Sequence, residues 1–356
     1  IFIFETSRVF LGLLLLIALG LRLIGAILGL AAAFLIQSLF YLLKYLLHEL
    51  KFRSGIRWDY IRGWLKASTI NVYGIISGRI LTLANIFLFI YAGELSRAYY
   101  GAASAIASII GYSSSLAFAL YPKLLSKADN GREDVVLSLK MVLMFAIPMA
   151  VGAIILSEDL LSILNVSYSV AKPILIILSI DALLSAFSSI FGLIVSGTEK
   201  FDTDTRISFR NIVKSKLFLL LTLHYVQAAM VTLPAYIFLS SAVVLNALEA
   251  ARYLALIVLV AGIFMTMARY MIAKRCLEFH MPWLSIGKYL ASSMIMALIL
   301  YVFQMPARLS FTVLRTLLGA LIYFTALLAI DRETRDLLKL AKREAMKKFL
   351  GPIQSG

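Results

Sequence analysis

Long apolar runs separated by short basic segments are the feature that most constrains how this chain folds. Residues 9–47 are almost continuously apolar, and comparable runs recur as far as residue 330. A membrane-spanning helix needs about 20 mainly apolar residues, so each run is long enough to cross a bilayer. Of the 356 residues, 62% are hydrophobic and only 15% are charged, whereas about 25% are charged in a typical soluble domain. The sequence therefore argues against a water-soluble enzyme and predicts an all-α, multi-spanning membrane protein.

The apolar runs predict about ten spans. These are residues 9–21, 24–47, 67–92, 97–121, 138–157, 173–197, 211–232, 250–273, 285–304 and 309–330. In the first run, Gly20 and Gly25 flank Arg22, which indicates a tight hairpin between two helices. Residues 233–249 are also apolar, but Pro234 interrupts them. We expect this segment to be interfacial or to lie in the outer leaflet between two spans.

The basic residues predict the orientation of the chain. Net charge is +15, and of 34 Lys and Arg, 23 fall in the loops on one side and 4 in the loops on the other. The richer side of a membrane protein faces the cytoplasm, so both termini are expected there, in the plasma membrane. The charge excess is therefore explained by orientation. We expect membrane lipids as partners and no nucleic acid.

Two cytoplasmic segments have amphipathic character. Residues 51–66 interleave Lys and Arg with Trp58, Tyr60 and Trp64, a pattern typical of a helix at the membrane interface. Residues 331–356 contain a basic amphipathic stretch that suits either contact with anionic lipid or a simply solvated helix.

The chain lacks the usual signatures of catalysis. It has no phosphate-binding loop, no His-Glu-x-x-His pair and no Gly-x-Ser-x-Gly nucleophile turn. It has one cysteine and three widely separated histidines. We therefore expect no catalytic residue, no metal and no cofactor, and predict that the protein is not an enzyme. The acidic pair Glu158-Asp159 could serve a membrane transferase, but it more simply ends a helix.

Polar side chains within the spans are the candidate functional residues. Charged groups in a bilayer are costly and usually face a cavity or the bundle interior. Arg79 and Asp181 lie well inside their spans, and Asn71 and Asn85 share the span of Arg79. These four predict a cavity, in which Arg79 and Asp181 either pair or both line the wall. Gln37 is a weaker candidate of the same kind.

Small and polar residues recur at helical spacing beside these candidates. The stripes are Asn71, Gly74, Gly78, Thr82 and Asn85; Asp181, Ser185, Ser188, Gly192 and Ser196; and Ser104, Ser108, Gly111 and Ser115. Close helix packing explains the Ser and Gly positions as well as a cavity does. A guanidinium binds phosphate and diphosphate bidentately, so Arg79 suits an anionic substrate. An Asp at comparable depth suits a counter-ion, a proton site or a Na⁺ site.

Three features resemble a known family. Residues 84–126 contain a Gly-bearing turn, a Tyr-Gly-Ala-Ala helix and a closing Pro122; residues 156–202 resemble the family's outer loop and tenth helix. The last four spans, followed by a basic C-terminus, match in spacing. The chain thus resembles the multidrug/oligosaccharidyl-lipid/polysaccharide exporter superfamily, and within it the Wzx-like polysaccharide flippases.

The resemblance implies a helical bundle of two lobes like that of the multidrug exporters. It would divide the chain into the end of a first lobe (1–50), a linker (51–66), a complete second lobe (67–273), a helix pair (274–330) and a tail (331–356). A full member carries about four more helices before residue 1, so the resemblance predicts either an N-terminally truncated chain or one whose missing helices another subunit supplies.

The resemblance further implies alternating access, which moves a lipid-diphosphate-linked oligosaccharide across the membrane. Arg79 would meet the substrate anion, and H⁺ or Na⁺ would be the coupling ion. Glycan-assembly enzymes would be partners. A cation-coupled drug exporter is the alternative, followed by a peptidoglycan-precursor flippase, a membrane-embedded glycan transferase or ligase, and a structural subunit.

Overall fold

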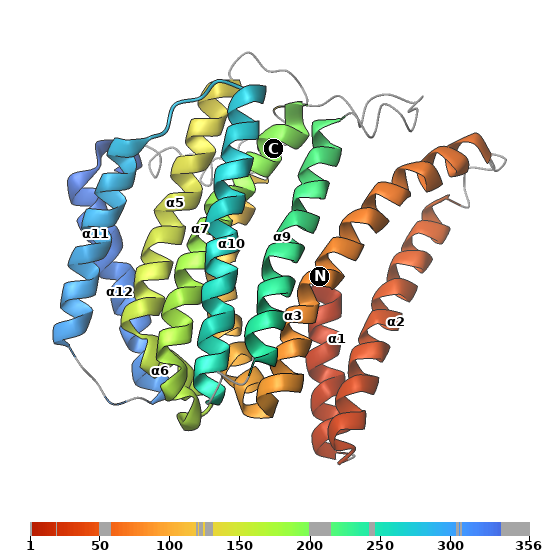
Figure 1. Ribbon diagram of the computed structural model, residues 1–356, viewed down its shortest axis with the longest axis horizontal. Coiled ribbons are helices and arrows are strands. Elements are labelled where there is room, and N and C mark those ends of the chain that lie inside the picture. The colour runs from red at the N-terminus through yellow and green to blue at the C-terminus, as the bar shows by residue number, and fades with distance from the viewer. Residues whose placement is uncertain are drawn as a thin grey trace, which may run out of the picture. The chain divides into compact units, whose positions relative to one another are not determined.

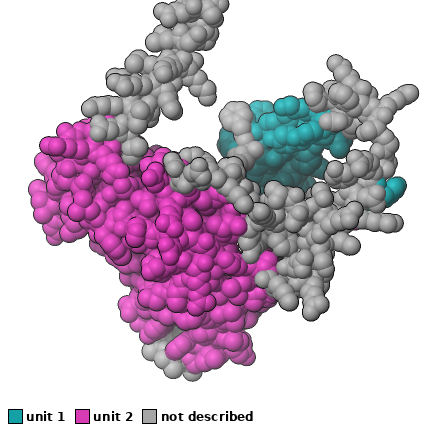
Figure 2. Space-filling model, turned by 90° about the horizontal axis from the view of Figure 1, so that it is seen from above, with its two compact units in different colours: residues 1–62 teal, residues 63–356 magenta. Residues whose placement is uncertain are grey.

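The computed structural model describes most of the chain in two compact units. The described residues are 2–18, 20–49, 58–118, 120, 124, 131–198, 215–241, 246–303, 306 and 308–335. Unit 1 is Ile1–Arg62 and unit 2 is Gly63–Gly356, coloured separately in Figure 2. Every regular element within the described residues is helical, which confirms the all-α prediction.

Unit 1 contains a helical hairpin. Helix α1 (Phe2–Leu13) continues as a short π-helical segment, η1 (Leu14–Ala18), and α2 (Arg22–Glu49) packs against it. Gly20 has φ +61°, a left-handed conformation that glycine adopts without steric cost. The predicted hairpin is confirmed, but it is tighter than expected because Arg22 already belongs to α2. Gly29 packs against the Gly12 backbone, where a Cβ would lie 3.4 Å from the Gly12 nitrogen.

Unit 2 consists of long helices joined by short elements (Figure 1). Helix α3 (Trp58–Gly111) begins in unit 1 and is followed by the 3₁₀ helix η2 (Tyr112–Ala117). The remaining elements are α5 (Gly131–Ile155), α6 (Ser157–Leu164), η3 (Val166–Ala171), α7 (Lys172–Thr198), α9 (Lys216–Ser240), α10 (Ala247–Cys276), α11 (Trp283–Val302) and α12 (Leu309–Ile330).

Helix α3 reverses direction at Gly93. This residue has φ +81° and ψ 178°, a conformation essentially restricted to glycine. The Ser96 hydroxyl donates to the carbonyl oxygens of Gly93 at 2.7 Å and of Leu88 at 3.3 Å. Residues eight apart in a straight helix would be separated by about 12 Å along its axis. The Leu88–Ser96 contact therefore requires a turn, and α3 holds two spans, as the sequence predicts.

The structure corrects the expectation for residues 233–249. Helix α9 runs without a break through Pro234 to Ser240, and α10 begins at Ala247. The expected interruption at Pro234 is therefore wrong: residues 233–240 extend the span of α9 and residues 247–249 begin α10, whereas residues 242–245 lie outside the described part of the chain. Proline is tolerated inside a spanning helix when its surroundings compensate for the missing hydrogen bond.

The structure also bears on the ends of the regions expected from the sequence. Residues 58–66 form the first turns of α3 and are continuous with the span that follows. Residues 51–57 of the expected interfacial linker lie outside the described residues, as do residues 336–356 of the expected tail.

Helix α7 is the central helix of unit 2, with α10 on one side and α5 on the other (Figure 1). Its first half, including Ile174 and Leu175, is buried with apolar residues of α3, α9 and α10. Its second half, including Ile190 and Phe191, is buried with residues of α5 and α10. A third cluster, which contains Tyr323, joins α5 to α11 and α12. Burial of these faces fixes the order of the helices.

The outward faces of the helices suit a lipid environment. Eight helical stretches of the described residues are long and apolar enough to span a membrane, with mean hydropathy from 1.5 to 2.2. One of them, Asn71–Ala117, contains the reversal at Gly93 and so holds two crossings. Large apolar side chains such as Leu298 and Leu321 point outward, with 70% and 62% of their surface exposed. These faces are stable against lipid chains, so the prediction of a multi-spanning bundle is confirmed.

Candidate functional site

The five polar residues singled out from the sequence fall on three helices. Gln37 is half-buried on α2 of unit 1, whereas the other four belong to unit 2. Asn71, Arg79 and Asn85 lie on the first span of α3, and Asp181 lies on α7.

The polar stripe of α3 lies on the surface of unit 2. Asn71, Gly78 and Arg79 are exposed, and no atom lies within 4 Å of a Cβ built on Gly78. Of the two glycines in the stripe, only Gly74 meets a neighbour closely, with its Cβ position 3.2 Å from Leu221 of α9. Close packing therefore accounts for Gly74 but not for Gly78. An exposed cation at this depth remains available to a ligand.

Asn85 has an unsatisfied polar atom. Its Oδ1 is buried and has no hydrogen-bond partner in the structure. A buried amide oxygen without a donor costs free energy. The Asn85 side-chain oxygen can therefore accept a hydrogen bond from a ligand.

Asp181 packs against a glycine of the neighbouring helix. A Cβ on Gly262 of α10 would collide with its Oδ1, so only a glycine admits the carboxylate at this position. Among the described ion pairs none joins Arg79 to Asp181, so the first of the two arrangements expected for these residues is not formed.

A polar cluster that sequence reasoning passed over joins α7, α9 and α10. The Arg269 guanidinium donates from Nη1 to the Ser188 hydroxyl at 3.2 Å, and its Nη2 lies 3.1 Å from His224 Nε2. His224 Nδ1 lies 2.9 Å from the Leu220 carbonyl oxygen. A guanidinium can only donate, so Nε2 must accept and Nδ1 must carry the proton. His224 is therefore a neutral, oriented acceptor in the middle of a network.

The sequence contains only a partial signal for this cluster. Arg269 is visible as a cation within a span, and Ser188 belongs to a polar stripe. His224 reads most simply as a residue that caps or packs at a helix end. Pairing of the three depends on how three helices align, and spacing along one helix does not reveal it.

A buried ion pair stabilises the end of the bundle where α12 begins. Arg315 of α12 bonds to Asp159 of α6, and 8% and 15% of these side chains are exposed. Arg315 Nη2 also donates to the Leu300 carbonyl oxygen of α11 at 2.9 Å. Asp159 therefore has a structural partner. Within the described part of the chain, no three His, Cys, Asp or Glu side chains gather as a metal site.

A second network lies at the opposite end, where α12 finishes. Lys288 Nζ of α11 donates to Asp331 Oδ1 at 2.9 Å, and the Thr334 hydroxyl donates to Asp331 Oδ2 at 2.6 Å. Burial alone would raise the pKa of Asp331, but the bonds from Thr334 and Lys288 outweigh it and hold the pKa below its ordinary value. Lys140 of α5 pairs with Glu333 at 2.5 Å. The network ties α5 and α11 to the end of α12.

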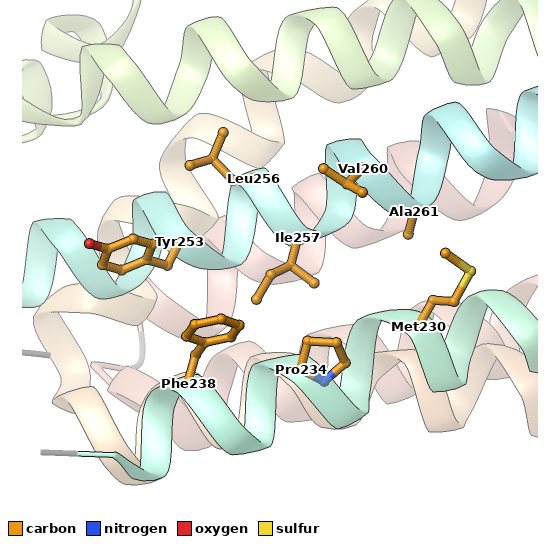
Figure 3. A pocket seen from close by; sticks show the side chains of 8 residues that line it. All are labelled: Met230, Pro234, Phe238, Tyr253, Leu256, Ile257, Val260 and Ala261. Atoms are coloured by element: carbon orange, nitrogen blue, oxygen red, sulfur yellow. The ribbon is translucent and has the colours of Figure 1, made fainter. Parts of the chain in front are cut away.

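An apolar pocket of about 460 Å³ lies between α9 and α10 (Figure 3). Met230, Pro234 and Phe238 line it from α9, and Tyr253 and Ile257 are among the residues that line it from α10. Its walls suit a hydrocarbon chain and offer no cation to a phosphate.

Comparison with known proteins identifies a structural relative. No protein-family model and no curated protein matches the chain. A solved structure described as "Lipid II flippase MurJ, inward closed conformation" matches with a TM-score of 0.63 at 18% identity, over 94% of this chain and 67% of that one. The chain shares that fold. The likeness supports the multi-spanning helical architecture over nearly the whole sequence.

Proposed function

We propose that the protein is a flippase that moves a lipid-linked glycan precursor across the membrane by alternating access. The observation that carries this proposal is the likeness of fold to a lipid II flippase over 94% of the chain. The chain would belong to the multidrug/oligosaccharidyl-lipid/polysaccharide exporter superfamily. It would lie in the plasma membrane with both termini in the cytoplasm, and H⁺ or Na⁺ would be the coupling ion.

The polar groups within the spans support a transporter of anions. Arg79 is exposed on α3, and Arg269 is half-buried and paired with no carboxylate among the described residues. Cations that have no acidic partner suit the diphosphate that links a glycan to its lipid. A drug exporter that takes up cations would need the opposite charge in its cavity, so the likeness and the charges both favour the glycan carrier.

The two kinds of glycan precursor that the observations favour share one chemical group. Polysaccharide precursors and peptidoglycan precursors are both polyprenyl-diphosphate-linked glycans. The sequence resemblance favours the first, and the relative's description favours the second. We therefore propose the polyprenyl diphosphate as the common recognition element, and glycan-assembly enzymes as suppliers and acceptors of the substrate.

The experiment that tests this function is flipping in reconstituted vesicles. The probe is a polyprenyl-diphosphate-linked saccharide carrying a fluorophore that an added reagent bleaches only on the outer surface. We expect the wild-type protein to expose the inner pool. Arg79→Ala should reduce the rate at least about tenfold, the loss expected for one charge-assisted contact, whereas Arg79→Lys should retain part of it. Absence of flipping by the wild-type protein would reject the function, and a normal rate for Arg79→Ala would reject the role of Arg79.

A further inference from the structure

The cluster of Arg269, His224 and Ser188 has donor capacity that the protein does not use. Two of the guanidinium nitrogens contact His224 and Ser188, which leaves further N–H groups of Arg269 free to donate. Within the described residues no carboxylate forms an ion pair with Arg269. A cation held in a spanning helix without a counter-ion is costly unless an anion arrives from outside.

The two partners hold the guanidinium in place. Ser188 is 2% exposed on the central helix α7, so its hydroxyl has little freedom. His224 is exposed, and its ring is anchored by the Leu220 carbonyl oxygen. The cluster is therefore rigid on the side of α7 and accessible on the side of His224. A guanidinium oriented in this way loses little entropy when it binds a second pair of acceptors.

The depth of the cluster matches the level of lipid phosphates. Helix α10 has 30 residues and is about 45 Å long, longer than the roughly 30 Å hydrocarbon core. Arg269 lies seven residues before the end of α10 at Cys276, or about 10 Å from that end. In a centred helix the side chain lies close to the boundary of the hydrocarbon. The basic loops predict that this boundary faces the cytoplasm.

We propose that Arg269, oriented by His224 and Ser188, binds the phosphate or diphosphate of a lipid headgroup at the inner-leaflet boundary. The inference rests on the proposed function in that the substrate's diphosphate is one source of this chemistry. A resident anionic phospholipid is the other source. Nη1 and Nη2 of Arg269 each have one N–H left after the contacts with Ser188 and His224, and a planar guanidinium can bind two oxygens of a phosphate through such groups.

Direct binding tests the site independently of transport. The purified protein is placed in nanodiscs of phosphatidylcholine, and a polyprenyl-diphosphate-linked saccharide is titrated and scored by its protection of the protein against thermal unfolding. A parallel series replaces part of the phosphatidylcholine with phosphatidylglycerol and omits the saccharide. The variants are Arg269→Gln, Arg269→Lys and His224→Leu. Arg252→Gln, an exposed arginine near the other end of α10, is the matched control.

The site predicts a graded loss of affinity. Arg269→Gln should weaken binding about tenfold or more, as expected for loss of a bidentate charge-assisted contact. Arg269→Lys and His224→Leu should each weaken it by a smaller factor, because charge remains but orientation is lost. Arg252→Gln should bind like the wild type. Weakening in the saccharide series alone assigns the site to substrate, and weakening in the phosphatidylglycerol series alone assigns it to resident lipid.

The failure of this inference is distinct from that of the proposed function. If Arg269→Gln and Arg252→Gln bind both ligands as tightly as the wild type, Arg269 is no phosphate site, even if the protein flips the fluorescent substrate. If the wild type does not flip it but Arg269→Gln still loses phosphatidylglycerol binding, the proposed function fails and the site stands.

Discussion

The reversal at Gly93 gives the sharpest test of the fold. Gly93 has φ +81° and ψ 178°, where a residue with a side chain costs about 1–3 kcal/mol. No atom lies within 4 Å of a Cβ built at Gly93, and the same is true of Gly78 in the same helix. Steric contacts therefore do not differ between the two sites, and only backbone conformation does.

The expected effects have opposite sign. Gly78 has no left-handed φ, so Gly78→Ala should stabilise the protein by up to about 1 kcal/mol through the higher helix propensity of alanine. Gly93→Ala should destabilise it by the cost of the strained conformation. The difference between the two variants should be about 1–4 kcal/mol in the free energy of unfolding.

The assay is unfolding in mixed micelles of a mild detergent and dodecyl sulfate, followed by helical circular dichroism. Wild type, Gly78→Ala and Gly93→Ala are compared at one lipid content and temperature. If the two variants agree within about 0.5 kcal/mol, the scale of an ordinary surface substitution, Gly93 does not adopt the left-handed conformation. Residues 71–117 would then not reverse at this point, and the reasoning would be refuted.

Two further predictions concern the networks at the ends of the bundle. Arg315→Met should destabilise the protein by about 3–5 kcal/mol, because it leaves the mostly buried Asp159 without its partner. Addition of Asp159→Leu should recover much of that loss in the free energy of unfolding. A double variant that is no more stable than Arg315→Met would contradict the pairing. Because the pKa of Asp331 is lowered, its contribution is present above the ordinary pKa of about 4 and is lost as pH falls through the folded value. Wild type should therefore lose stability relative to Asp331→Asn between about pH 5 and pH 3, and parallel melting curves over this range would exclude a stabilising role for the Lys288 bond.

Much of the fold follows from local properties of the sequence. The apolar runs set where helices cross, because every backbone group in a bilayer must be bonded within its own helix. Gly20 marks the first hairpin, since a left-handed residue favours glycine. The error at residues 233–249 has a local cause as well. Pro234 predicts an interruption by its missing N–H, whereas α9 packs against α10 and continues through it.

The candidate site was predictable only in part. Arg79 and Asp181 stand out as charges inside spans, and the structure places one on an exposed face and the other against Gly262. That these two form no ion pair follows from the alignment of α3 and α7. Depth along separate helices does not determine that alignment. The roles of Arg79, Asp181, Asn71, Asn85 and Gln37 in binding stay predictions.

The sequence by itself determined that this chain is helical and spans a membrane, because hydropathy acts through short stretches of chain. The tertiary structure alone decided which polar groups meet. Arg269 reaches His224 and Ser188 across 45 and 81 positions, and Arg315 reaches Asp159 across 156. Such pairs depend on the rotation and order of packed helices, which burial of α7 between α5 and α10 sets.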